Sequence, residues 1–250
     1  MDARIEFLHR MGDTALILGH RVSEWCGHGP VLEEDIALAN TALDLIGQSQ
    51  MWLTLAGESE GAARTADDLA FHRDAHEFRN LLIVERPNGD FGHTILRQFL
   101  FDVYHFELLT RLGNGQDAEI SAVAQKAVKE VSYHLERSSD LVVRLGDGSD
   151  ESHRRMQSAL DQLWPYTGEM LMRDKVDEAM AERGILPDPV SITEVWNQRV
   201  ASTLDMATLA VPEHRGVQKG GKDGRMHSEH LGHLLATMQI LPRSYPDAQW

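Results

Sequence analysis

The stretch Lys129-Glu130-Val131-Ser132-Tyr133-His134-Leu135 nearly spells the Glu-x-x-His pair of a helical di-iron site. A histidine ligand on a helix needs its carboxylate partner three residues earlier, one turn back on the same face. That position is Val131, whereas Glu130 lies four residues before His134. The stretch therefore has the form of a metal-binding helix in which valine replaces one ligand.

The sequence around this stretch reads almost entirely as helix. Apolar residues recur at helical spacing in segments that we expect to span residues 5–26, 33–56, 67–85, 91–112, 117–145, 151–164, 168–183, 192–209 and 225–241. Glycine and proline clusters separate these segments. The longest would measure roughly 33–43 Å at 1.5 Å per residue, which is typical of a bundle.

The segments predict an all-α protein with a single domain over residues 1–250. We expect a four-helix core over about residues 5–145 and helical additions over about residues 151–241. In the segment 33–56, the apolar stripe that we expect to face the core carries Ile36, Ala39, Leu43, Ile46 and Leu53.

Composition excludes several classes of partner. The formal net charge of −15 argues against nucleic acid and against anionic membrane surfaces. No apolar run approaches the roughly 18–20 residues of a membrane span, and the charged N-terminus is not a signal peptide. The single cysteine, Cys26, excludes an intrachain disulfide and fits a reducing cytoplasm. Because Cys26 closes an apolar stripe, we expect its thiol to be buried.

Two of the predicted core helices carry polar residues on their inward stripes. Asp102 lies on such a stripe and His105 follows three residues later, which is a true Asp-x-x-His spacing. His134 lies on the inward stripe of the next helix, together with Val131. Buried polar groups must be paired, so these side chains predict a hydrogen-bonded cluster within the core.

The set of di-iron ligands is incomplete. Asp44 neighbours the inward stripe of its helix, but Gly47 stands where a histidine would be needed. One imidazole, at Gly47, and one carboxylate, at Val131, are therefore missing. We interpret Asp44, Gly47, Asp102, His105, Val131 and His134 as the remains of a di-iron site that binds no metal.

Two alternatives remain open from the residues alone. Glu130 and His134 have the i,i+4 spacing of ligand pairs in zinc-protease helices. An independent di-iron oxidase could then use Asp44, Asp102, His105, Glu130 and His134. A ferritin-like metal-binding protein is the other alternative, although the ligand set is incomplete for that role too.

Four stretches of the chain carry a resemblance to a known family. They are LGHRVSEWCGHGPVLEEDIALANTALDLIGQ (18–48), FHRDAHEFRNLLIVERPNG (71–89), KEVSYHL (129–135) and HSEHLGHLLATMQILPRSYP (227–246). On the basis of these stretches, the chain resembles the PaaC family. Members of this family are the non-catalytic, ferritin-like subunits of the bacterial ring 1,2-phenylacetyl-CoA epoxidase. The resemblance spans essentially the whole chain.

The resemblance implies a ferritin-like four-helix bundle with additional helices. It also implies a PaaA-like catalytic subunit that holds the di-iron centre, a PaaB-like component, and a reductase that supplies electrons from NADPH. The complex would epoxidise phenylacetyl-CoA in aerobic phenylacetate catabolism. Valine at position 131 matches the non-catalytic role that the resemblance implies. The catalytic PaaA-type subunits carry glutamate at the equivalent position. The resemblance assigns no catalytic, cofactor-binding or metal-binding residue to this chain.

A glycine-rich basic run, residues 218–225, precedes the last predicted helix. Helix N-termini bind phosphate groups, so a contact with the phosphates of coenzyme A is one interpretation. The run matches no defined phosphate loop, and we expect a mobile loop or a contact between subunits instead. His227, His230 and His233 follow it at three-residue spacing, which spreads them around a helix and favours a surface or interface role.

Overall fold

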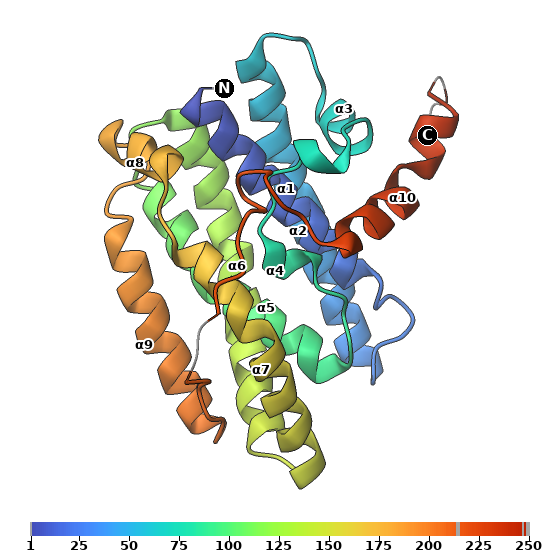
Figure 1. The fold of residues 1–250 in the computed structure, drawn as a ribbon, viewed down its shortest axis with the longest axis vertical. Coiled ribbons are helices and arrows are strands. Elements are labelled where there is room, and N and C mark those ends of the chain that lie inside the picture. Colours follow the sequence, from blue (N-terminus) through green and yellow to red (C-terminus); the bar gives the residue numbers. More distant parts are fainter. Residues whose placement is uncertain (1, 214–215, 247, 249–250) are drawn as a thin grey trace. The chain divides into compact units, whose positions relative to one another are not determined.

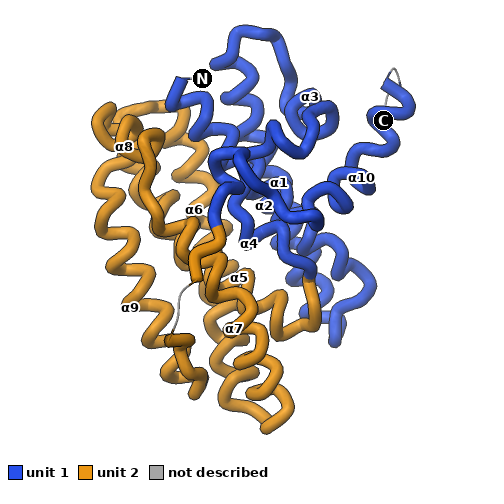
Figure 2. Tube along the Cα trace, in the orientation of Figure 1, with its two compact units in different colours: residues 1–87, 219–250 blue, residues 88–218 orange. Residues whose placement is uncertain are grey.

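The computed structural model describes residues 2–213, 216–246 and 248, and every regular element in that part of the chain is a helix (Figure 1). Clustering of contacts divides the chain into two compact units (Figure 2). The first comprises residues 1–87 and 219–250, and the second comprises residues 88–218. The all-α prediction is confirmed, and the helices are consistent with a ferritin-like bundle. The single domain over residues 1–250 stays a prediction. Among the described helices, none has the length and hydropathy needed to span a bilayer.

An antiparallel hairpin of α1 (Ala3–Ser23) and α2 (Leu32–Glu60) forms the main part of the first unit. The two helices approach closely at Gly12, where a Cβ atom would lie only 2.5 Å from Cδ2 of Leu53. Asp2 caps the start of α1, and its carboxylate accepts a hydrogen bond from the backbone nitrogen of Arg4. Gly61 caps the end of α2 in the left-handed conformation that glycine adopts without strain.

The α2 helix is apolar on two faces, and the stripe predicted to face the core is largely the exposed one. Leu38, Leu45 and Trp52 are fully buried, whereas the predicted core residues Ile36 and Leu43 are 52% and 67% exposed. The prediction for these residues is wrong, because helical periodicity identifies an apolar face but not which of two such faces the fold covers.

A second antiparallel hairpin, α5 (Phe91–Leu112) and α6 (Ala118–Gly146), forms the main part of the second unit. Asp117 caps α6 by accepting hydrogen bonds from two backbone nitrogens of its first turn. Helices α7 (Asp150–Leu171) and α9 (Val190–Met206) both pack against this hairpin, and α8 (Lys175–Glu182) connects them. The predicted helices over 91–112 and 117–145 are confirmed to within a residue.

The helix predicted over residues 67–85 is wrong. The structure has α3 (Ala66–Phe71), a 3-10 turn at Ala75–Glu77 and α4 (Leu82–Glu85) instead. Thr65 and Asp74 each start a short helix with a capping box, which gives the backbone local partners outside a continuous helix.

Two further predictions need correction. A single helix, α7, runs through Pro165 to Leu171, and the break falls later, where Asp174 caps α8 with a capping box. Cys26 is exposed because α1 ends at Ser23 and the cysteine lies in the turn that follows.

The C-terminal segment returns to the first unit and ends in α10 (Glu229–Ser244). The carboxylate of Glu85, fully buried at the end of α4, anchors the start of this segment. Its Oε1 is 2.6 Å from Nδ1 of His227, and its Oε2 accepts hydrogen bonds from the backbone nitrogen and Oγ of Ser228. His227 therefore has a structural role within its own chain.

The glycine-rich basic run forms an ordered turn in front of α10. Backbone nitrogens of Arg225 and Met226 donate to the carbonyl of Gly220, and the Arg225 guanidinium pairs with Asp223. At Gly221 a Cβ atom would run into the carbonyl oxygen of Asn80, so glycine allows this close approach. The side chain of Lys219, near the start of the run, is exposed.

Candidate functional site

The second unit holds a buried carboxylate between α5 and α6. Asp102 of α5 is fully buried. Its Oδ1 accepts a hydrogen bond of 2.6 Å from Nε2 of Gln98, one turn earlier on α5. Its Oδ2 accepts a hydrogen bond of 2.8 Å from Oγ of Ser138 on α6. Two neutral donors from two helices thus satisfy both oxygens, as a buried carboxylate requires.

The surroundings of Asp102 change its acidity. Burial raises the pKa of Asp102 from its ordinary value of 3.8 to about 6, because the charged form loses its hydration. The nearby His134 and the hydrogen bonds from Ser138 and Gln98 lower the pKa, but by less than burial raises it. Asp102 is therefore a carboxyl group that titrates close to neutral pH.

His105 lies one turn after Asp102 on the same helix and is 3% exposed. Its ring packs against Phe101, with 4.8 Å between the ring centroids. Burial, with a smaller effect of His134, lowers the pKa of His105 to about 3. The imidazole is therefore neutral at physiological pH. Its buried Nδ1 has no hydrogen-bond partner among the residues that the structure describes.

The α6 helix contributes Val131, His134 and Ser138 to this interior. Val131 and Ser138 are fully buried and His134 is 3% exposed, so the predicted inward stripe is confirmed by burial. Glu130 lies beside the stripe and is half-buried. The residue at the carboxylate position of Glu-x-x-His is thus an apolar side chain within the core.

Asp44 and Gly47 belong to α2 in the first unit, not to the α5–α6 hairpin. Asp44 is half-buried, and a Cβ atom at Gly47 would meet nothing within 4 Å. Both therefore lie beside the partly exposed face of α2. Their interpretation as remains of a di-iron site stays a prediction.

The ligand chemistry of the second unit can be compared with what a di-iron centre needs. Such a centre uses several carboxylates to neutralise and bridge two cations, whereas the Asp102 cluster offers one carboxylate and two imidazoles. Within the described ranges, no group of three or more His, Cys, Asp or Glu side chains has an arrangement that could hold a metal ion. The donor set as placed is that of a polar core cluster.

Sequence reasoning missed the two residues that satisfy Asp102. Gln98 lies four residues before Asp102, a spacing at which side chains on a helix meet, so it could have been found. Ser138 could be placed on the inward stripe of its helix, but its pairing with Asp102 depends on the register between α5 and α6. That register follows from packing along the whole hairpin.

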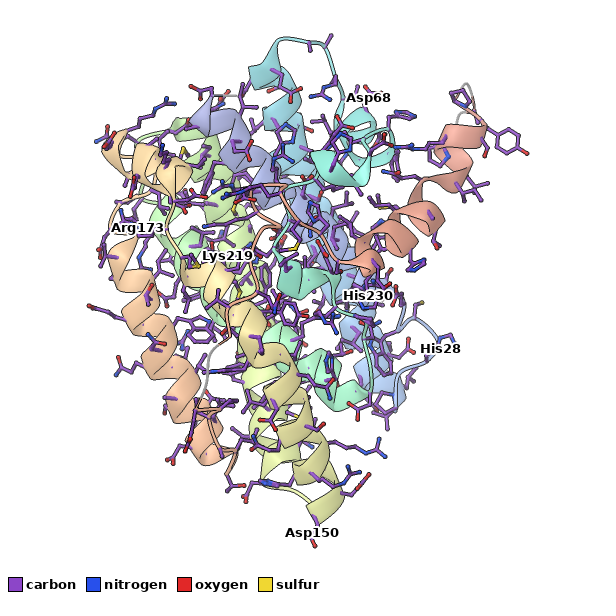
Figure 3. The ribbon with its side chains drawn as sticks, in the orientation of Figure 1. His28, Asp68, Asp150, Arg173, Lys219 and His230 are labelled. Carbon is purple, nitrogen blue, oxygen red and sulfur yellow. The ribbon has the colours of Figure 1, made fainter. Side chains whose placement is uncertain are left out.

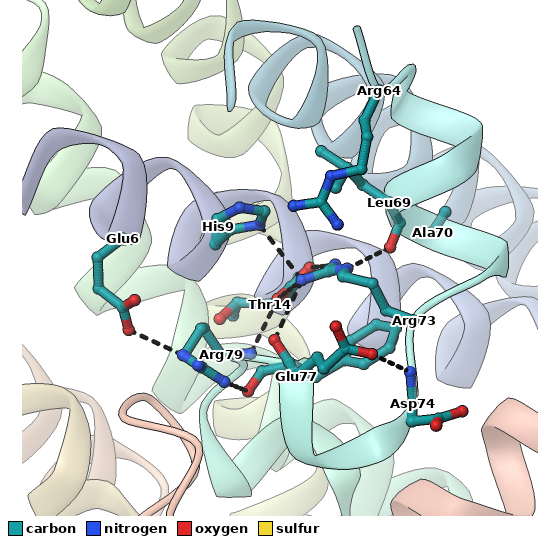
Figure 4. Close-up of polar contacts among 12 residues, drawn as sticks. Glu6, His9, Thr14, Arg64, Leu69, Ala70, Arg73, Asp74, Glu77 and Arg79 are labelled. Atoms are coloured by element: carbon teal, nitrogen blue, oxygen red, sulfur yellow. Dashed lines mark hydrogen bonds and ion pairs between the residues drawn. The ribbon is translucent and has the colours of Figure 1, made fainter. Parts of the chain in front are cut away.

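A second buried charged cluster lies in the first unit (Figure 4). Asp13 of α1 is fully buried and forms a bidentate ion pair with the guanidinium of Arg73. The backbone nitrogen of Arg79 donates to Asp13 Oδ2 at 2.8 Å. Arg73 also lies over the ring of Phe78, 4.4 Å from its centroid. The cluster fixes the irregular segment after α3 against α1, and so has a structural role.

Comparisons with known proteins agree along the whole length of the chain. The family model described as phenylacetic acid catabolic protein matches residues 1–250. The chain is similar to a protein of Escherichia coli (strain K12), the C subunit of 1,2-phenylacetyl-CoA epoxidase. The two are 46% identical over 241 residues, which are 96% of each chain.

Proposed function

Because the chain belongs to the family of phenylacetic acid catabolic proteins, we propose that it is the structural, non-catalytic subunit of a phenylacetyl-CoA 1,2-epoxidase. The observation that carries this proposal is the full-length similarity to the C subunit of such an epoxidase. In this role the chain supports a catalytic subunit during aerobic phenylacetate catabolism in the cytoplasm.

The Asp102 cluster supports a non-catalytic role. The carboxylates of a di-iron centre bind and bridge the two cations, whereas the oxygens of Asp102 accept hydrogen bonds from Gln98 and Ser138. Val131 gives an apolar side chain to the position that requires a bridging carboxylate. The residues of this cluster stabilise the hairpin, and the chain itself holds no metal.

The proposed complex divides its tasks among subunits. A PaaA-like subunit holds the di-iron centre at which oxygen is activated, and a reductase passes electrons to it from NADPH. A PaaB-like component completes the assembly. This chain contributes helical surface that keeps the catalytic subunit in its active shape.

The proposal is tested by purifying the chain alone, the PaaA-like subunit alone, and the two together. Iron content and oxidation of phenylacetyl-CoA, with reductase and NADPH present, are measured for each. We expect iron in the PaaA-like subunit and turnover only when that subunit is present, increased by this chain. Stoichiometric iron and turnover from this chain alone would contradict the proposal and support an independent di-iron oxidase.

The variant His134→Ala separates the two functions further. In an independent oxidase this change removes a ligand, so bound iron is lost. In a structural subunit it creates a cavity in the α6 core, so the protein is destabilised while its iron content stays unchanged. His28→Ala, at an exposed histidine (Figure 3), is the matched control for both measurements.

A further inference from the structure

The exposed face of α2 carries a continuous apolar row, which we call the α2 seam. The row consists of Leu32, Ile36, Ala39, Leu43 and Ile46. Leu32, Ile36 and Leu43 are 70%, 52% and 67% exposed, and Ile46 at the edge is 36% exposed. Contiguous exposed apolar surface of this kind marks an interaction site more often than isolated exposed residues do.

The spacing of the α2 seam indicates what kind of surface binds there. Its residues follow one another at intervals of 4, 3, 4 and 3 positions, which is the heptad spacing of a coiled-coil seam. An apolar row with this spacing packs well along another helix that crosses at a small angle. The matching partner of the α2 seam is therefore an α-helix.

The surface beside the seam leaves room for a close helix. Gly47 adjoins Leu43 and Ile46 on the helix surface, and a Cβ atom there would meet nothing within 4 Å. Ala39 in the middle of the seam is also small. Small residues let the backbone of a second helix approach closely. Apolar side chains of that helix can then pack into the spaces between the α2 side chains around Leu43.

The charges of α2 identify the class of partner. The helix carries Glu33, Glu34, Asp35, Asp44, Glu58 and Glu60 and has no lysine or arginine. The whole chain has a formal net charge of −15. Two copies of this chain meeting along α2 would bring carboxylates together on both sides of the contact. A different polypeptide with basic residues flanking its apolar helix face complements both the seam and its rim.

We propose that the α2 seam is the docking surface for an amphipathic helix, with basic flanks, of the catalytic subunit. This inference rests on the proposed function for the identity of the partner. The seam supplies the apolar contact, and Glu33 and Asp44 supply charge complementarity at its edges. Ile36 and Leu43, which were expected in the core but are exposed in the single chain, are then buried against the partner helix.

The test uses the full-length chain with Leu43→Glu or Ile36→Glu, each titrated with the PaaA-like subunit by isothermal calorimetry. Ile240→Glu is the matched control, because Ile240 is 60% exposed and belongs to a different helix, α10. We expect each seam variant to bind at least about tenfold more weakly, as for a central contact residue, and the control to bind within about twofold of wild type.

Thermal melting of each variant alone separates docking from folding. Because the seam side chains are exposed, we expect the melting temperatures of the seam variants to stay close to wild type. A large loss of stability for Leu43→Glu would mean that the chain itself covers this face, and would overturn the proposal.

The remaining outcomes are also decisive. If wild type binds the PaaA-like subunit and the seam variants bind equally well, the seam assignment fails while the proposed function stands. If wild type does not bind that subunit at all, both fail. If sedimentation shows that the wild-type chain alone is a dimer and Leu43→Glu is a monomer, the occupant is a second copy and the proposal is wrong.

Discussion

At the scale of single residues, Asp102 shows how a position from a metal-site pattern becomes part of a core. Its carboxylate is fully buried, yet each oxygen has a hydrogen-bond donor, Gln98 Nε2 or Ser138 Oγ. The two neutral donors reduce the cost of burying the charge but do not remove it, and the pKa of Asp102 is therefore raised to about 6.

This raised pKa predicts a pH dependence of stability. The folded protein binds a proton at Asp102 below about pH 6, whereas the unfolded chain binds it only below its ordinary pKa of 3.8. The stability that Asp102 contributes is therefore fully present below about pH 4 and is lost as the pH rises to about 6 and beyond. The loss amounts to about 3 kcal/mol.

The variant Asp102→Asn removes this titration while keeping the shape of the side chain. We expect it to become more stable relative to wild type as the pH rises from 4 to 7, as measured by urea unfolding at each pH. Asp140→Asn, at an exposed aspartate of α6, should track wild type. Parallel stability curves for wild type and Asp102→Asn would show that Asp102 titrates normally.

At the scale of helices, α2 is unusual because it is apolar on two faces that meet different environments. One face packs on α1, where a Cβ atom added at Gly12 would meet Leu53 and one added at Gly19 would meet Leu45 and, at the edge of the seam, Ile46. The other face carries the α2 seam. The change in stability when a glycine of α1 or α2 is replaced by alanine therefore measures how tightly the face around that glycine is packed.

The pair Gly47→Ala and Gly12→Ala tests this difference. Both exchanges gain helix propensity, about 1 kcal/mol for glycine to alanine within a helix. At Gly47 the added methyl group meets nothing, so we expect the isolated chain to gain about 0.5–1 kcal/mol. At Gly12 the methyl group displaces Leu53, so overpacking should make this variant about 1–3 kcal/mol less stable than Gly47→Ala. Urea unfolding of both variants measures the difference, and equal stabilities would contradict the hairpin packing.

The anchoring of the C-terminal segment depends on Glu85. The change Glu85→Ala leaves Asn80, His227 and Ser228 without their common buried acceptor. We expect the protein to lose about 2–5 kcal/mol of stability. Because α10 depends on this anchor, its amides should exchange faster with deuterium. Glu229→Ala, at an exposed carboxylate, should leave exchange in α10 unchanged.

At the scale of the whole molecule, the net charge of −15 decides which partners are favourable. A strongly acidic surface repels copies of itself and nucleic acid, and it attracts proteins with basic surface. Glu33 and Asp44 make this general property specific, because each follows a seam residue, Leu32 or Leu43, by one position on α2. Partner binding should then combine an apolar contact with long-range attraction.

Binding of the PaaA-like subunit should therefore depend on salt. Between about 50 and 500 mM NaCl we expect affinity to fall about three- to tenfold, because rim charges are screened while the seam contact persists. Glu33→Gln should reduce this dependence, and Glu136→Gln, at an exposed glutamate of α6, should not. If the affinity does not depend on salt, charge complementarity does not contribute to the proposed interface.

Periodicity predicted most helices because long amphipathic helices are encoded locally. The helix over 91–112 matches α5 residue for residue, since apolar residues recur every turn and Gly113 follows the last one. The prediction of one helix over 67–85 was wrong. In this segment, backbone groups bond to capping side chains at Thr65 and Asp74, and the backbone nitrogen of Arg79 donates to the distant Asp13 of α1. Contacts of that kind lie outside any local window of sequence.

By itself, the sequence determined the all-α class, the long helices over 91–112 and 117–145, the burial of Asp102, His105 and His134, and the full-length family resemblance. These features depend on helical spacing and on residue identity, which can be read from the chain. Only the tertiary structure decided that Ile36 and Leu43 face outward and that Gln98 and Ser138 are the partners of Asp102. The physical reason is that local sequence does not say which of two apolar faces of a helix is buried. Nor does it say which of several polar neighbours pairs with a buried carboxylate. Packing against a specific neighbouring helix selects among them.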